Sequence, residues 1–143
     1  MKTVRGEGFE VQVPPDWARI EQPGDAFTLA DSVGGVGAVQ ISIAPNATWE
    51  KPSVTDLRDI IQTMAEANQL GAPTEASYFD TEALRGAVCT YVHGEDFIRV
   101  WSVSDGTSFA LATYVCRKGS ENLETETVEL IVRSLRFSLP GVA

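Results

Sequence analysis

The chain of 143 residues has little of the chemistry that most enzyme classes need. It contains one histidine and two cysteines, and none of its serines, cysteines or carboxylates lies in a recognisable nucleophile motif. A closed metal site needs several ligands at suitable spacings, which a single histidine and its sequence neighbours do not provide. We therefore expect a protein that is not an enzyme, with no catalytic residue, no metal and no cofactor.

Long apolar segments are also absent. No stretch approaches the ~18 apolar residues of a membrane-spanning helix. The segment from Met1 to Pro14 contains Arg5, Glu7 and Glu10 and lacks the apolar run of roughly 7–15 residues that a secretory signal requires. We expect a cytoplasmic protein that does not bind membranes. A mature exported domain placed behind a new Met1 would have the same sequence, so that alternative stays open.

Positive charge is in short supply. Eleven lysines and arginines against 20 acidic residues leave a net charge of −9, which repels nucleic-acid phosphates and favours encounters with basic molecules. This charge predicts no nucleic-acid binding and indicates a protein partner, with a basic one favoured, although it also serves to keep a small protein in solution. The oligomeric state does not follow from the charge.

What is present is the composition of one folded domain spanning residues 1–143, with 43% hydrophobic and 22% charged residues. Alternation of apolar and polar residues, interrupted by proline, glycine and aspartate, predicts short strands. We expect them at residues 9–13, 17–20, 26–30, 38–43, 75–82, 86–92, 96–104 and 107–116.

Two segments have the three-and-four spacing of an amphipathic helix. The first, at about 53–70, begins with a capping serine, Ser53, followed three residues later by Asp56, and a glycine and a proline follow its end. The second, at about 121–135, has glutamates near its start and arginines near its end, which agrees with the helix dipole.

The dipeptide Asp105-Gly106 predicts a hairpin between the last two strands. Pairing Ser104 with Thr107 places Arg99 and Trp101 on one face of the sheet and leaves both faces largely apolar. Such a sheet must be covered on both sides. We therefore predict an α+β fold, a mainly antiparallel sheet of about seven strands between helices, arranged as an αβα sandwich.

Two local signatures resemble those of PsbP-like domains. The first is Phe9-Glu-Val-Gln-Val-Pro-Pro-Asp-Trp17, a strand that ends in proline and then tryptophan, and the second is Ile131-Val-Arg-Ser-Leu-Arg-Phe137, a closing helix and strand. This group includes photosystem extrinsic subunits, a Ran-GTPase-binding regulator, lipoproteins and bacterial immunity proteins. The resemblance implies a PsbP-like fold, a non-enzymatic role in binding another protein, such as that of an immunity or adaptor protein, and no shared catalytic set.

Tryptophan and arginine are the side chains that most often dominate binding surfaces. Trp17, Trp49, Arg99 and Trp101 are therefore the candidate partner-binding residues, with Trp49 in a loop before the first helix. The alternative is that Trp101 is covered by a helix and that Trp17 fills one end of the sheet.

A rival hypothesis is a small-ligand-binding protein or weak hydrolase with a cleft at the sheet edge. It would use His93 or a carboxylate, whereas we expect His93 to lie in a solvated turn between strands.

The two cysteines, Cys89 and Cys116, are predicted to be free. The predicted strand order separates them by two strands and about three residues, or roughly 14 Å, which is beyond the reach of a disulfide.

Overall fold

The computed structural model describes residues 1–21, 26–45 and 52–138 and contains two antiparallel sheets and two α-helices. The larger sheet has seven strands in the order β3-β4-β5-β9-β8-β7-β6, and the smaller has three in the order β1-β2-β10. The strands of the larger sheet are β3 (Trp17–Ile20), β4 (Phe27–Asp31), β5 (Gly37–Pro45), β6 (Glu75–Asp80), β7 (Arg85–His93), β8 (Asp96–Ser104) and β9 (Ser108–Arg117). The smaller sheet comprises β1 (Lys2–Gly6), β2 (Phe9–Val13) and β10 (Arg136–Phe137).

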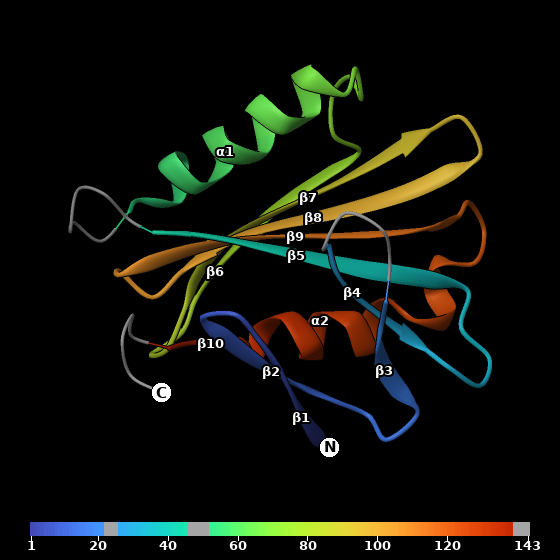
Figure 1. The fold of residues 1–143 in the computed structure, drawn as a ribbon. Coiled ribbons are helices and arrows are strands. Elements are labelled where there is room, and N and C mark those ends of the chain that lie inside the picture. Colours follow the sequence, from blue (N-terminus) through green and yellow to red (C-terminus); the bar gives the residue numbers. More distant parts are fainter. Residues whose placement is uncertain (22–25, 46–51, 139–143) are drawn as a thin grey trace.

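The helices lie on opposite faces of the larger sheet, as Figure 1 shows. Helix α1 (Val54–Ala67) packs over β7 and β8, and its buried side chains Leu57, Ile61 and Ala65 contact one apolar cluster. Helix α2 (Thr125–Arg133) and the smaller sheet cover the other face and share a second, larger cluster with it. The predicted α+β architecture, with a seven-stranded antiparallel sheet between helices, is confirmed. Among the described residues, no helix is both long and apolar enough to cross a bilayer.

Helix α1 begins where the sequence predicts and ends earlier. The Ser53 hydroxyl accepts a hydrogen bond from the Asp56 amide at 3.1 Å, and the Asp56 carboxylate accepts one from the Ser53 amide at 3.0 Å, which completes a capping box. The predicted end at residue 70 is three residues too late because Gln69 takes a left-handed conformation with φ of 56°. The Leu70 amide then bonds the Ala65 carbonyl, which closes the helix.

Helix α2 is shorter than the predicted 121–135. A 3₁₀ turn, η1 (Glu121–Leu123), precedes it. Glu124 lies between the turn and the helix and has a non-helical φ of −131°. The Glu124 carboxylate lies in the core, where its Oε1 accepts hydrogen bonds from the Tyr114 hydroxyl at 2.8 Å and the Gly37 amide at 3.0 Å. The chain therefore enters the helix only at Thr125, because Glu124 is held by these tertiary contacts.

The register of the β8–β9 hairpin differs from the prediction by two residues. Ser104 pairs with Phe109 and not with Thr107. The turn is longer because Asp105 Oδ1 accepts hydrogen bonds from the amides of Thr107 and Ser108, at 2.8 and 3.2 Å. A shift of two residues leaves every side chain on the same face, so the predicted division of residues between the faces is correct.

The smaller sheet was not predicted. Only β2 has an alternating apolar pattern, and its buried residues Phe9, Val11 and Val13 pack in the α2-side cluster. Strand β1 is largely exposed and pairs along the whole of β2, while β10 pairs with the other edge of β2.

The two cysteines lie on opposite faces of the larger sheet. Cys89 pairs with Val100 and packs under α1, whereas Cys116 pairs with Phe97 and packs on the α2 side. Both are free and buried, as predicted. Burial is the main cause that raises the pKa of both thiols.

We therefore expect unreduced protein to titrate slowly with a thiol reagent in the folded state, because both sulfurs are shielded and protonated. In guanidinium, both thiols of the same sample should react rapidly with the reagent. Protein reduced beforehand is the control and should give the same total. A total of zero in the unreduced, denatured sample would show a disulfide and contradict the pairing of β7, β8 and β9.

Candidate functional site

The structure places the candidate tryptophans differently from the prediction. Trp17 is 3% exposed and Trp101 is 0% exposed, so neither indole ring is available to a partner. The alternative stated for them, that they belong to the core, is confirmed. Trp49 lies outside the described residues, so its assignment stays a prediction.

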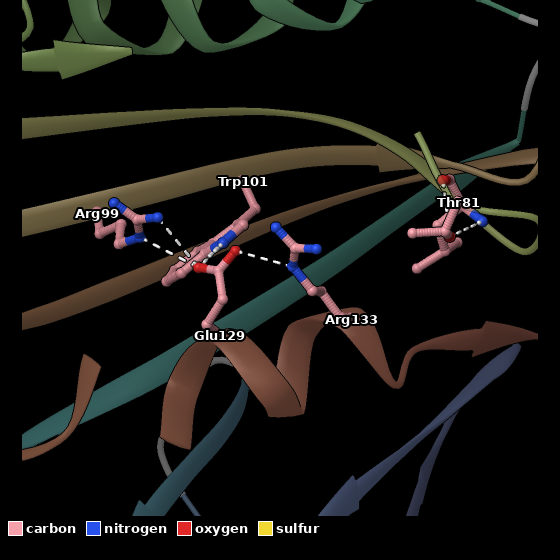
Figure 2. A network of polar contacts seen from close by, with 6 residues as sticks. Thr81, Arg99, Trp101, Glu129 and Arg133 are labelled. Carbon is pink, nitrogen blue, oxygen red and sulfur yellow. Dashed lines mark hydrogen bonds and ion pairs between the residues drawn. The ribbon is translucent and has the colours of Figure 1, made fainter. Parts of the chain in front are cut away.

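Arg99 is also removed from the candidate binding surface, because it is bound to α2. Glu129 Oε2 accepts hydrogen bonds from the Trp101 indole at 2.9 Å and from Arg99 Nη2 at 3.1 Å. Glu129 Oε1 accepts one from Arg133, one helical turn later, at 3.1 Å. Figure 2 shows Glu129 at the centre of this network, between the sheet residues and Arg133. The Arg99 guanidinium lies 5.3 Å from the centre of the Trp101 ring, a cation–π contact. These residues therefore attach α2 to β8.

His93 is the last residue of β7 and pairs with Asp96 of β8 across the tight turn formed by Gly94 and Glu95. Gly94, which follows it, has a φ of 62°, and His93 itself is exposed. This confirms the expected solvated turn. His93 lines none of the four clefts described for the molecule. No group of three or more histidine, cysteine or acidic side chains is arranged to hold a metal ion within the described part of the chain.

A cleft of about 530 Å³ separates the start of α2 from β6, β7 and β8. Glu75, Glu121 and Glu126 line it together with Arg99 and the exposed Val92. The Arg99 side chain is already paired with Glu129. The cleft is therefore an acidic surface with a single cation that is not free to bind an anion.

The feature that stands out on the opposite side is a part of the larger sheet over which no described helix packs, bordered by Phe109 and Leu111, which contact the α1 cluster. Helix α1 packs over β7 and β8, and the same face continues across β9 and β5. Four cross-strand pairs present their side chains there, and we call these eight residues the open face: Ala38–Val115, Gln40–Thr113, Ser42–Leu111 and Ala44–Phe109. All eight are exposed or half-buried, and none is charged. In a chain of net charge −9, an uncharged surface of this kind is a candidate interaction site.

The open face has a hollow at each margin. On one side, a groove of about 780 Å³ extends from Gln40 and Thr113 past the edge of β5 to Phe9 and Phe27. On the other side, a smaller pocket of about 170 Å³ lies between α1 and the strands β5, β8 and β9. We call it the Ser102 pocket. Its lining includes Ile60 of α1, Ser102 of β8, Ser42 and Ala44 of β5, and Phe109 and Leu111 of β9.

Sequence reasoning missed the open face although part of its signal was available. The predicted hairpin faces already grouped Phe109, Leu111, Thr113 and Val115. The hairpin pattern does not predict where α1 packs on the sheet. The sequence therefore predicts that both faces of the sheet are covered along their whole width. A helix with its side chains is about 10 Å wide, which is about two strands at a spacing of ~4.8 Å.

No family model and no curated protein matches the sequence. The solution structure of a cyanobacterial PsbP (CyanoP) from Synechocystis is similar over 92% of this chain and 87% of that chain, with a TM-score of 0.65 and 13% identity. A crystal structure from Bacteroides thetaiotaomicron is similar over 94% of this chain and 46% of that chain, with a TM-score of 0.60 and 18% identity.

This chain has a PsbP-like fold. The two signatures that resembled PsbP-like domains fall on the elements that build it: residues 9–17 form β2 and the start of β3, and residues 131–137 form the end of α2 and β10. The PsbP-like fold fixes the architecture and, at these identities, nothing about the partner.

The Glu129 network generates a stability prediction. In Glu129→Ala, the buried Trp101 indole N–H loses its acceptor and Arg99 loses its ion pair. We expect the free energy of unfolding, measured by urea denaturation, to fall by about 1–3 kcal/mol.

Glu126→Ala is the matched control, because it removes the same charge from the exposed side of the same helix. It loses only a favourable interaction with the helix N-terminus and should cost about 1 kcal/mol or less. Equal losses in the two variants would contradict the role given to the network.

Proposed function

We propose that this protein is a non-enzymatic protein-binding domain and that its partner docks on the open face. The observation that carries the proposal is the uncharged, exposed or half-buried surface of β5 and β9 in an otherwise strongly acidic protein. The apolar part of this surface comes from Ala44, Leu111, Val115 and their neighbours, and exposed apolar area that is contiguous favours interaction with another macromolecule. The PsbP-like fold is consistent with a non-enzymatic domain.

The shape of the open face supports docking of a folded partner. Its eight side chains belong to every second cross-strand pair of two adjacent strands and are neighbours on one face, so they present one continuous surface. The exposed Val115 lies at one end and the exposed Ala44 at the other, with Gln40 and Ser42 between them. Small and medium-sized side chains held by a sheet provide a rigid surface, which lowers the entropy cost of binding.

The charge of the protein indicates what kind of partner this surface accepts. The open face itself is neutral, while the whole chain has a charge of −9. A partner seated on the face brings its own margin close to the surrounding acidic surface. We therefore propose a partner with an apolar patch bordered by lysine or arginine, because that arrangement makes the potentials complementary.

The same charge disfavours a second copy of this chain as the occupant. Two copies docked face to face would bring together two bodies of charge −9, and like charges brought together at an interface oppose association. The expected state of the isolated protein is a monomer. A dimer in sedimentation analysis that dissociates in a variant with a charged open face would identify this chain as its own partner and overturn the proposal.

The small-ligand or hydrolase alternative has less support from the structure. It assigned a functional role to His93, which is exposed at the end of β7 and lines none of the described clefts. The groove and the acidic cleft are both broad and open to solvent. A protein surface fits these shapes better than a small molecule that must be enclosed.

Two valine substitutions test the proposal. Val115, on the open face, is 39% exposed, and Val92, on the opposite face of the same sheet, is 42% exposed. Immobilised wild-type protein should retain a specific protein from an extract of native host cells, identified by quantitative mass spectrometry. Val115→Glu should reduce its retention about tenfold or more, because the new carboxylate would lose its water against the apolar patch of the partner.

Val92→Glu is the matched control and should retain the same protein at the wild-type level. Both variants should unfold at the urea concentration of the wild type, because both positions are partly solvated. The proposal fails if every protein retained by the wild type is retained equally by Val115→Glu, or if only Val92→Glu loses it, which would assign binding to the acidic cleft.

A further inference from the structure

The Ser102 pocket contains a polar group with no partner. Ser102 is 1% exposed, and its hydroxyl forms no hydrogen bond within the described part of the chain. The rest of the lining is mainly apolar, with Ile60, Phe109 and Leu111 around it. A buried hydroxyl without a hydrogen bond is destabilising, and such groups are rare in folded proteins.

The neighbouring serine shows what a structural hydroxyl on this strand does. Ser104 lies two residues further along β8, on the same face, and is also 1% exposed. Its hydroxyl donates to the Ser108 carbonyl at 2.8 Å and accepts from the Gly106 amide at 3.0 Å, which holds the hairpin turn. Ser102 has no comparable structural role among these contacts, and its buried hydroxyl is left without a partner.

The size of the pocket limits what can enter it. Its volume is about 170 Å³, and an apolar cavity of about 150 Å³ in a protein interior accommodates benzene. One six-membered aromatic ring therefore fits. The pocket opens beside Ser42, Ala44 and Leu111, which belong to the open face, so a side chain on a docked partner has direct access to it.

We propose that the Ser102 pocket receives a tyrosine side chain of the partner protein, an inference that rests on the proposed function. The ring lies among Ile60, Phe109 and Leu111, and the phenol hydroxyl exchanges a hydrogen bond with the Ser102 hydroxyl. Tyrosine combines the apolar ring that the walls require with the polar end that the hydroxyl requires, and it is enriched among the residues that dominate protein interfaces. A phenylalanine or leucine fills the same space but leaves Ser102 without a partner.

The test uses p-cresol as the probe for a tyrosine side chain and toluene as the probe for phenylalanine. Both are titrated into the isolated protein and followed by amide chemical shifts. We expect p-cresol to shift amides around the pocket, those of Ser42, Ser102 and Leu111 among them, and to bind about 2- to 10-fold more tightly than toluene, the gain of one net hydrogen bond.

Ser102→Ala should remove or reverse this preference, because the phenol hydroxyl then has no hydrogen-bond partner in the pocket. Its midpoint of urea denaturation should be unchanged or higher, because no hydrogen bond is lost. Ser104→Ala is the matched control. It should lower the midpoint, because two hydrogen bonds are lost, and should keep the preference for p-cresol.

Three results would overturn the inference: no binding of either probe, binding elsewhere on the protein, or a preference that survives in Ser102→Ala. These outcomes are independent of the partner. If Val115→Glu abolishes capture while p-cresol does not bind, the pocket inference fails and the docking face stands.

The source of the phenol is tested on the captured complex. If the partner supplies the tyrosine, p-cresol should release the retained protein more effectively than toluene. Binding of p-cresol without release would show that the pocket takes a free phenolic molecule, which overturns the assignment to a partner.

Discussion

The structure depends on the need to cover a wide sheet that is apolar on both sides. The larger sheet has seven strands, and a single helix, about 10 Å across, covers about two of them. On the α2 side, the smaller sheet and α2 together cover the face and bury the larger of the two clusters, from Phe9 to Leu135. On the α1 side, the described structure has one helix, over β7 and β8. The same face continues beyond α1 onto β5 and β9, where the side chains are uncharged and exposed or half-buried. This part is the open face.

Polar contacts to two glutamates fix the covered side. Glu129 binds Trp101 and Arg99 from α2, and Glu124 binds Tyr114 and the backbone of Gly37 immediately before α2 begins. Burial, more than the hydrogen bond to Glu124, raises the pKa of Tyr114 well above its usual range. The phenol therefore stays protonated and remains a donor. Both carboxylates thus bind residues of the sheet. The contacts of Glu129 explain why two of the candidate binding residues, Arg99 and Trp101, belong to the packing between α2 and β8.

Gly37 shows how close this contact is. A side-chain carbon at position 37 would lie 2.5 Å from the Val115 carbonyl oxygen and 2.8 Å from the Tyr114 hydroxyl. Only glycine allows β5 to approach β9 and Glu124 at this point. The close contact of Gly37 with β9 and Glu124 therefore positions the start of β5 and of the open face. It also positions the start of α2.

The sequence by itself determined the local structure, the fold class and the division of side chains between the sheet faces. Strand alternation, capping at Ser53 and the Asp105-Gly106 turn are contained in a few neighbouring residues, so they can be read without a partner segment. It also determined that Cys89 and Cys116 stay apart. The tertiary structure alone decided the edges of the sheets and the start of α2. Strand β1 has no pattern of its own and forms by pairing with β2. Helix α2 begins only after Glu124, because Tyr114 and Gly37 bind that residue. The candidate site follows the same division. Local pattern grouped Leu111, Thr113 and Val115 on one face, but whether a helix covers that face depends on where α1 packs, and this is a contact between segments distant in the chain.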